Sequence, residues 1–125
     1  MITDIKFNPK DWKKDLYIAS KVDVSYDDER NELPIYGQPQ LYKFNYQSVS
    51  SNSEVAEFGE KTSIMKKAVI PIAYKGQFKE FDVAYLDGIT PDSETVNGRN
   101  ANYRLLPPRD GNAVIIIYFE KLAGK

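Results

Sequence analysis

The strongest pattern in the chain is an apolar run near its C-terminal end, "VIIIYF", at residues 114–119. A half-exposed strand alternates apolar and polar residues, because successive side chains point to opposite faces of a sheet. In this run both faces are apolar. The two sets are Ile115, Ile117 and Phe119 on one face, and Val114, Ile116 and Tyr118 on the other. The pattern therefore predicts a strand that is covered on both faces.

Shorter segments alternate with a period of two, which indicates further strands. They lie at 18–26, 41–49, 66–74, 81–85 and 103–106. Within them, Tyr42, Phe44 and Tyr46 share one face, which we expect to point into the core. Turn-forming dipeptides such as Asp87-Gly88 and Asp110-Gly111 separate the segments. Together they predict a mainly β fold, a small β-barrel or sandwich of about six strands with one or two short helices and long loops.

Two segments carry the signals of a helix start. Asn8 followed by Pro9 predicts an N-terminal helical segment over residues 1–16, in which Trp12 and Leu16 share a face. Further along, Ser51 with Glu54 three residues later is a capping-box signature, and Gly59 ends that turn.

We expect a single domain over residues 1–125, with the helical segment at 1–16 and a barrel core at 17–122. Its loops are expected at 27–39, 49–65 and 88–102. The first contains the acidic run 27–29, which has neither the spacing nor the glycine of a calcium-binding loop. The third contains Asn97-Gly98, a strong hairpin-turn signal, so 88–102 is predicted to project as a hairpin arm.

Composition narrows the function classes. The 125 residues include 17 basic and 18 acidic ones, for a net charge of −1, whereas a protein that grips nucleic acid through its phosphates needs a clustered basic excess. Cysteine and histidine are both absent, which excludes thiol chemistry and disulfides and removes the commonest general base and metal ligand.

The remaining chemistry would need paired carboxylates. Asp82 and Asp87 flank one predicted strand, but both fit ordinary turn positions. We expect no enzyme, no cofactor and no metal. The first residues lack the apolar core of a signal peptide, and no run is long enough to span a membrane, so we expect a soluble protein folded in a cytoplasm.

From residue 40 to residue 122, the order of elements and several short motifs follow one family. The segments that carry the likeness are Glu57-Phe58-Gly59-Glu60, Lys67–Ile72, Gly76, Asp82, Asn102–Leu105 and Val114–Phe119. In these the chain resembles the head-closure, or head–tail joining, proteins of long-tailed phages. Residues 1–39 and the 88–102 loop depart from that pattern.

The resemblance implies a virion structural protein of the phage neck, assembled in the cytoplasm of a host bacterium. It implies a homo-oligomeric ring, six- or twelve-fold, that joins a portal or adaptor protein on the head side to a tail terminator or tail tube protein. DNA would pass through the lumen without specific binding, and no catalytic residue, cofactor or membrane is implied. Because a basic lumen would hold phosphates, the acidic runs at 27–29 and 91–94 are candidates for lumen or docking loops.

A ring needs interfaces between its subunits and with its neighbours. The candidate interface residues are Glu57, Phe58, Glu60, Asp92, Glu94, Asn97, Arg99, Val114, Ile116 and Tyr118. The last three form the second apolar face of the C-terminal strand, where each buried side chain is worth roughly 1.5–3 kcal/mol. We expect Trp12 and Leu16 to cover part of that face and a neighbouring subunit to cover the rest. Cover by the 51–65 segment, and complete cover within one chain, are the alternatives.

A second function class stays open. Small barrels with OB-like or SH3-like folds bind single-stranded nucleic acid or glycans through exposed aromatic residues. An aromatic face beside a basic groove would favour such a binding module, whereas the near-neutral charge favours the ring subunit.

Overall fold

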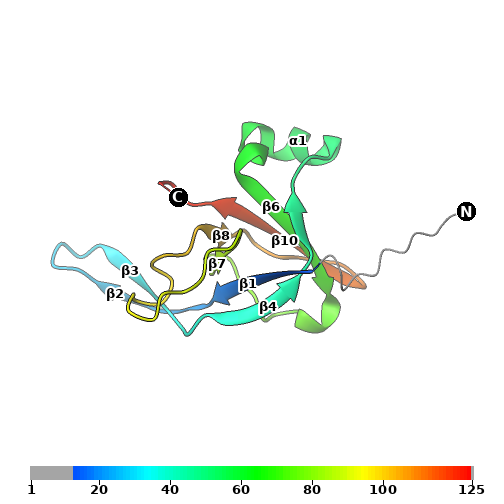
Figure 1. Ribbon diagram of the computed structural model, residues 1–125. Helices are drawn as coiled ribbons and strands as arrows, with labels where there is room; N and C mark the ends of the chain where they lie inside the picture. Colours follow the sequence, from blue (N-terminus) through cyan, green and yellow to red (C-terminus); the bar gives the residue numbers. More distant parts are fainter. Residues whose placement is uncertain (1–12, 125) are drawn as a thin grey trace, which may run out of the picture.

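A computed structural model describes residues 13–124 of the chain (Figure 1). The N-terminal helix predicted for residues 1–16 therefore lies mostly outside the described residues, and so does Trp12. The part of this prediction that can be compared with the structure is wrong, because Lys14, Asp15 and Leu16 belong to the first strand and not to a helix. Leu16 alternates with Ile18 on the inner face of that strand, and both are buried.

The described residues form ten strands and one α-helix. The strands are β1 (Lys14–Ala19), β2 (Lys21–Tyr26), β3 (Glu32–Tyr36), β4 (Gln40–Phe44), β5 (Tyr46–Ser48), β6 (Met65–Pro71), β7 (Val83–Tyr85), β8 (Tyr103–Leu105), β9 (Arg109–Asp110) and β10 (Val114–Lys121). The helix α1 (Asn52–Phe58) continues into the 3₁₀ segment η2 (Gly59–Ile64), and a second 3₁₀ turn, η3, covers Ile72–Tyr74. The predicted mainly β fold is confirmed.

The main sheet nearly closes into a barrel. Its strands follow the order β4-β1-β7-β8-β10-β6-β5, all neighbours are antiparallel, and β9 pairs with β10 at the side. A single residue, Asn45, separates β4 from β5. This bent segment pairs with β1 through its first half and with β6 through its second half, which joins the two ends of the sheet.

The barrel interior holds the main core. One face of β10, made of Ile115, Ile117 and Phe119, points inward and is fully buried. The predicted inward face of 41–49 is confirmed, because Phe44 and Tyr46 are buried in the same cluster. The alternation in both strands thus separates core from surface as the sequence indicates.

The other face of β10 is covered from outside, by the same chain, over only part of its length. Tyr118 is 5% exposed and packs with Val49, Met65 and Phe58, so the 49–65 segment is its cover. The expected contribution of Leu16 to this face is wrong, because Leu16 lies in the inner core. At the far end of the strand Val114 is still 40% exposed.

A projecting hairpin exists, but not where the sequence predicts it. β2 and β3 form a separate two-stranded sheet that extends from the barrel, at the left of Figure 1. The expected loop 27–39 therefore contains a strand, β3. The 88–102 segment contains turns and no strand, so the hairpin arm predicted there is wrong. We call residues 21–36 the arm.

Candidate functional site

The helix α1 begins with the predicted capping box. Ser51 Oγ accepts a hydrogen bond from the backbone N–H of Glu54 at 3.2 Å, and the Ser51 N–H donates to Glu54 Oε1 at 3.2 Å. The helix has only seven residues. Helices of this length are unstable alone, so contacts with the barrel must hold it in place.

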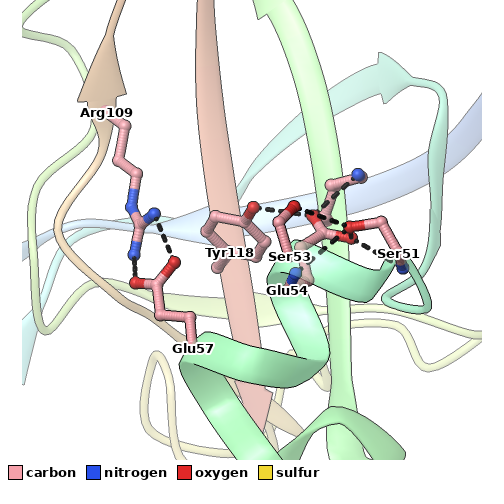
Figure 2. Close-up of polar contacts among 7 residues, drawn as sticks. Ser51, Ser53, Glu54, Glu57, Arg109 and Tyr118 are labelled. Carbon is pink, nitrogen blue, oxygen red and sulfur yellow. Dashed lines mark hydrogen bonds and ion pairs between the residues drawn. The ribbon is translucent and has the colours of Figure 1, made fainter.

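Those contacts converge on the carboxylate of Glu54, which is 5% exposed (Figure 2). Its Oε2 accepts from Lys67 Nζ at 2.7 Å and from the Tyr118 hydroxyl at 2.6 Å, while Oε1 accepts from Ser51 Oγ at 2.8 Å. Burial by itself would raise the pKa of Glu54, but the hydrogen bonds from Lys67, Tyr118 and Ser51 outweigh burial and lower this pKa to about 2. The group is a structural anchor between α1, β6 and β10.

A second ion pair lies at the edge of this anchor, closer to solvent. Arg109 Nη1 donates to Glu57 Oε1 at 2.9 Å, and Nη2 donates to the other carboxylate oxygen (Figure 2). The guanidinium of Arg109 lies 4.9 Å from the ring centroid of Tyr118 and 5.4 Å from that of Phe58. Four of the candidate interface residues therefore meet on one surface beside α1: Glu57, Phe58, Ile116 and Tyr118. Glu60 is exposed in the adjoining η2 segment, and Val114 lies further along β10.

The other candidate interface residues lie in the 88–102 loop, far from α1 in Figure 1. Asp92 accepts hydrogen bonds from the backbone N–H of Glu94 and from the Thr95 hydroxyl, which closes a turn. Glu94 and Arg99 are exposed, and Asn97 is half-buried. The sequence groups these residues with those around α1, whereas the fold separates them.

The same loop braces the base of the arm. The N–H of Gly98 donates to the Tyr85 hydroxyl at 2.9 Å. A Cβ atom at position 98 would lie 2.4 Å from the ring of Tyr36, the last residue of β3, and φ is +84° there. Only glycine allows this close approach, so the loop and the arm fit together at this point.

A buried carboxylate fixes the other strand of the arm. Asp82 accepts hydrogen bonds from the backbone N–H groups of Lys21, at 2.9 Å, and Lys79, at 3.0 Å. Burial raises the pKa of Asp82 in spite of these hydrogen bonds. Beside it, Phe81 has a φ of +76°, which is a strained conformation for a bulky residue, and its side chain is exposed. Asp82, a candidate catalytic acid in the sequence, thus uses its carboxylate to fix the start of the arm by hydrogen bonds.

Beyond this base the arm exposes apolar side chains. The register pairs Ser25 with Leu33 and Asp23 with Ile35, so Leu33 and Ile35 share one face of the ribbon. They are 46% and 40% exposed. At the tip, Asp27 accepts hydrogen bonds from the backbone of Glu29 and Asn31. Sequence reasoning missed this surface because the segment 27–39 is mostly polar.

A shallow groove of about 320 Å³ lies at the end of the barrel away from the arm. Its lining includes Lys13, Lys43, Phe44, Val69, Pro71 and Tyr74. Val69 is 47% exposed and pairs with Ile116, while Pro71 pairs with Val114, so the groove adjoins the uncovered end of the outer face of β10.

The described part of the chain, residues 13–124, contains no group of three or more acidic, histidine or cysteine side chains that could hold a metal ion. Within the same residues no helix has the length and apolar character needed to cross a membrane.

Comparisons of this chain with protein-family models, curated proteins and solved structures find no match.

Proposed function

We propose that this protein is a structural subunit of a phage virion, a neck-ring protein that joins the DNA-filled capsid to the tail. The observation that carries the proposal is that the arm and the end of β6 lie at opposite ends of one small barrel (Figure 1) and that both expose apolar side chains. A connector must contact partners on two sides at a fixed spacing, and a rigid scaffold that carries loops and arms meets that need. The likeness of residues 40–122 to head-closure proteins points in the same direction.

The distribution of charge supports passage of DNA rather than its capture. Between residues 27 and 32 the tip of the arm carries four acidic residues and one arginine. Asp92 and Glu94 add negative charge on the neighbouring loop, where both are exposed. An acidic surface repels phosphates, so a ring with the loop of Asp92 and Glu94 near its lumen lets the duplex slide, while the acidic arm tip is available for contact with another subunit.

One observation favours the alternative, a binding module for single-stranded nucleic acid or glycan. The groove brings Lys13 and Lys43 close to Tyr74. However, a stacking platform needs rings that are free to receive a base. Tyr42, Phe44, Tyr74 and Phe78 instead contact one another, with centroids 5.1 to 6.3 Å apart. Measured binding to a single-stranded oligonucleotide should therefore be weak and should disappear as salt is added.

The direct experiment is to locate the protein in virions of the phage that encodes it. We expect cryo-electron microscopy of the neck to show a closed ring of copies between portal and tail, with barrel density that fits residues 13–124. A virion preparation that lacks the protein, or a single copy bound to nucleic acid, would contradict the proposal.

A further inference from the structure

We propose that the arm of one copy docks into the groove of the next copy, so that the subunits join head to tail. In this contact the Leu33–Ile35 face of the arm meets Val69 and Pro71, and the acidic tip meets Lys13 and Lys43. The inference rests on the proposed function in one respect only, because it requires the chain to assemble with itself.

Both surfaces expose apolar side chains. Leu33 and Ile35 are exposed on the same face of a two-stranded ribbon, beside their cross-strand partners Ser25 and Asp23. At the other end of the molecule, exposed Val69 and Pro71 adjoin exposed Val114 across the β6–β10 ladder. Two-stranded ribbons are marginal in water without a surface to pack against. Contact between the two surfaces would remove these apolar side chains from solvent.

Their charges are opposite. Residues 27–32 include Asp27, Asp28, Glu29 and Glu32 against one arginine. Among the described residues that line the groove, two are lysines and none is acidic. Lys43 has an exposed ion pair with Asp15 at 3.7 Å, which is weak enough to exchange for a new partner. Charge complementarity therefore selects the acidic arm as the occupant of the groove.

The geometry directs the contact to a second copy. The arm lies at one end of the molecule in Figure 1, and the end of β6 with the start of β10 lies at the other, so an arm does not reach its own groove. Asp82 and Gly98 hold the base of the arm, which therefore leaves the barrel in a defined direction. A contact between two different surfaces of identical subunits is heterologous, and it closes into a ring when the rotation allows.

Cysteine cross-linking tests the contact, since the natural chain has no cysteine. Ile35→Cys and Val69→Cys are placed in separate chains, mixed, and oxidised. Arm–groove docking predicts cross-links in the mixture but few in either variant alone. A chain that carries both cysteines then separates two arrangements: head-to-tail contacts give cross-linked species larger than a dimer, whereas a reciprocal two-fold dimer stops at the dimer and would overturn the head-to-tail inference. Val55→Cys, on the exposed side of α1, is the matched control for Val69→Cys because both positions are 47% exposed. A 35–69 yield no higher than the 35–55 yield would overturn the inference.

Charge reversal adds a second readout. Lys13→Glu with Lys43→Glu in the groove partner, or Asp28→Lys with Glu29→Lys in the arm partner, should each lower the cross-linking yield about tenfold. Mixing both reversed partners should restore it. A groove filled by residues 1–12 of its own chain, or by a nucleic acid, would block the 35–69 cross-link, and either result would overturn the inference.

The outcomes also separate this inference from the proposed function. A neck ring seen in virions without the 35–69 cross-link would remove the arm–groove contact and leave the function standing. Efficient 35–69 cross-linking of a protein that is absent from virions would support the arm–groove contact and contradict the proposed function.

Discussion

The helix α1 and the arm are both too small to be stable alone, yet they are attached to the barrel in different ways. α1 is tied to the barrel by one buried carboxylate, Glu54, which accepts hydrogen bonds from three side chains. The arm is held at its base through Asp82 and Gly98, while its middle and tip are in solvent. Among residues 13–124, the contacts of α1 are thus complete, whereas the arm presents surfaces that have no partner.

The difference shows what each element is suited for. A buried polar group with every acceptor satisfied fixes a single position for the helix that carries it, and it is costly to disturb. Leu33 and Ile35 on the arm contribute little to the stability of the isolated chain, because they are exposed. Substitutions near α1 should therefore affect folding, and substitutions on the arm should affect assembly.

The largest expected effect is that of Glu54→Gln. The neutral amide leaves Lys67 without its counter-ion and weakens the bond from Tyr118, so we expect the free energy of unfolding to fall by about 3 kcal/mol. Urea unfolding followed by tyrosine fluorescence and circular dichroism measures this change. The matched control is Glu57→Gln on the same helix. The ion pair between Glu57 and Arg109 is exposed, so its loss should change the free energy of unfolding only slightly. Equal effects from the two variants would contradict the role of burial.

Acid should produce the next largest effect. Since the pKa of Glu54 falls from 4.5 to about 2 on folding, its contribution is complete above about pH 5 and is lost as the pH falls towards 2. With a discount for solvent screening beneath a short surface helix, the loss is on the order of 2 kcal/mol. Asp82 opposes this change, because its raised pKa adds stability only at low pH.

The pH effect can be assigned to one group by unfolding at several pH values. The Glu54→Gln variant should lose most of the dependence between pH 5 and pH 2. An unchanged dependence in that variant would show that other carboxylates cause it.

A smaller effect is expected from Gly98→Ala at the base of the arm. The added methyl group meets the ring of Tyr36 and requires a positive φ, so we expect a loss of about 2 kcal/mol in thermal unfolding. Gly76→Ala is the control, because φ is +82° there and no other group lies within 4 Å of the new Cβ. It should cost about 1 kcal/mol, from backbone strain alone. If the two costs were equal, the loop would not brace the arm.

The smallest effect on stability should come from shortening the arm. Replacing residues 24–34 by an Asn-Gly turn keeps Lys21, Asp82 and Tyr36 at the base, so the unfolding free energy should change by less than about 1 kcal/mol. Self-association, measured by sedimentation, should be lost at the same time. A shortened chain that unfolds much more easily would show that the arm belongs to the folding core.

Much of the barrel could be predicted from the sequence, because burial imposes a regular pattern on its strands. The two apolar faces of β10, the aromatic face at Phe44 and Tyr46, and the capping box at Ser51 all follow from local spacing. The arm could be predicted only in part. β2 lies within the segment 18–26, whose alternation predicts a strand, whereas β3 buries little, contains Pro34 and has almost no alternation to detect.

The anchor of α1 escaped prediction for a different reason. Glu54 is buried only because Lys67 and Tyr118, 13 and 64 residues away in the sequence, come to it in the fold. No local pattern indicates such a group. The candidate interface residues were likewise divided between two ends of the molecule by a topology that sequence spacing does not encode.

Hydrogen exchange of the assembled species, compared with the isolated chain, tests the central claim most directly. If the subunits join through the arm, amides in residues 21–36 and around Val69 should gain protection on assembly, while amides of α1 should exchange as before. Protection gained at α1, with an arm that exchanges at an unchanged rate, would contradict the account.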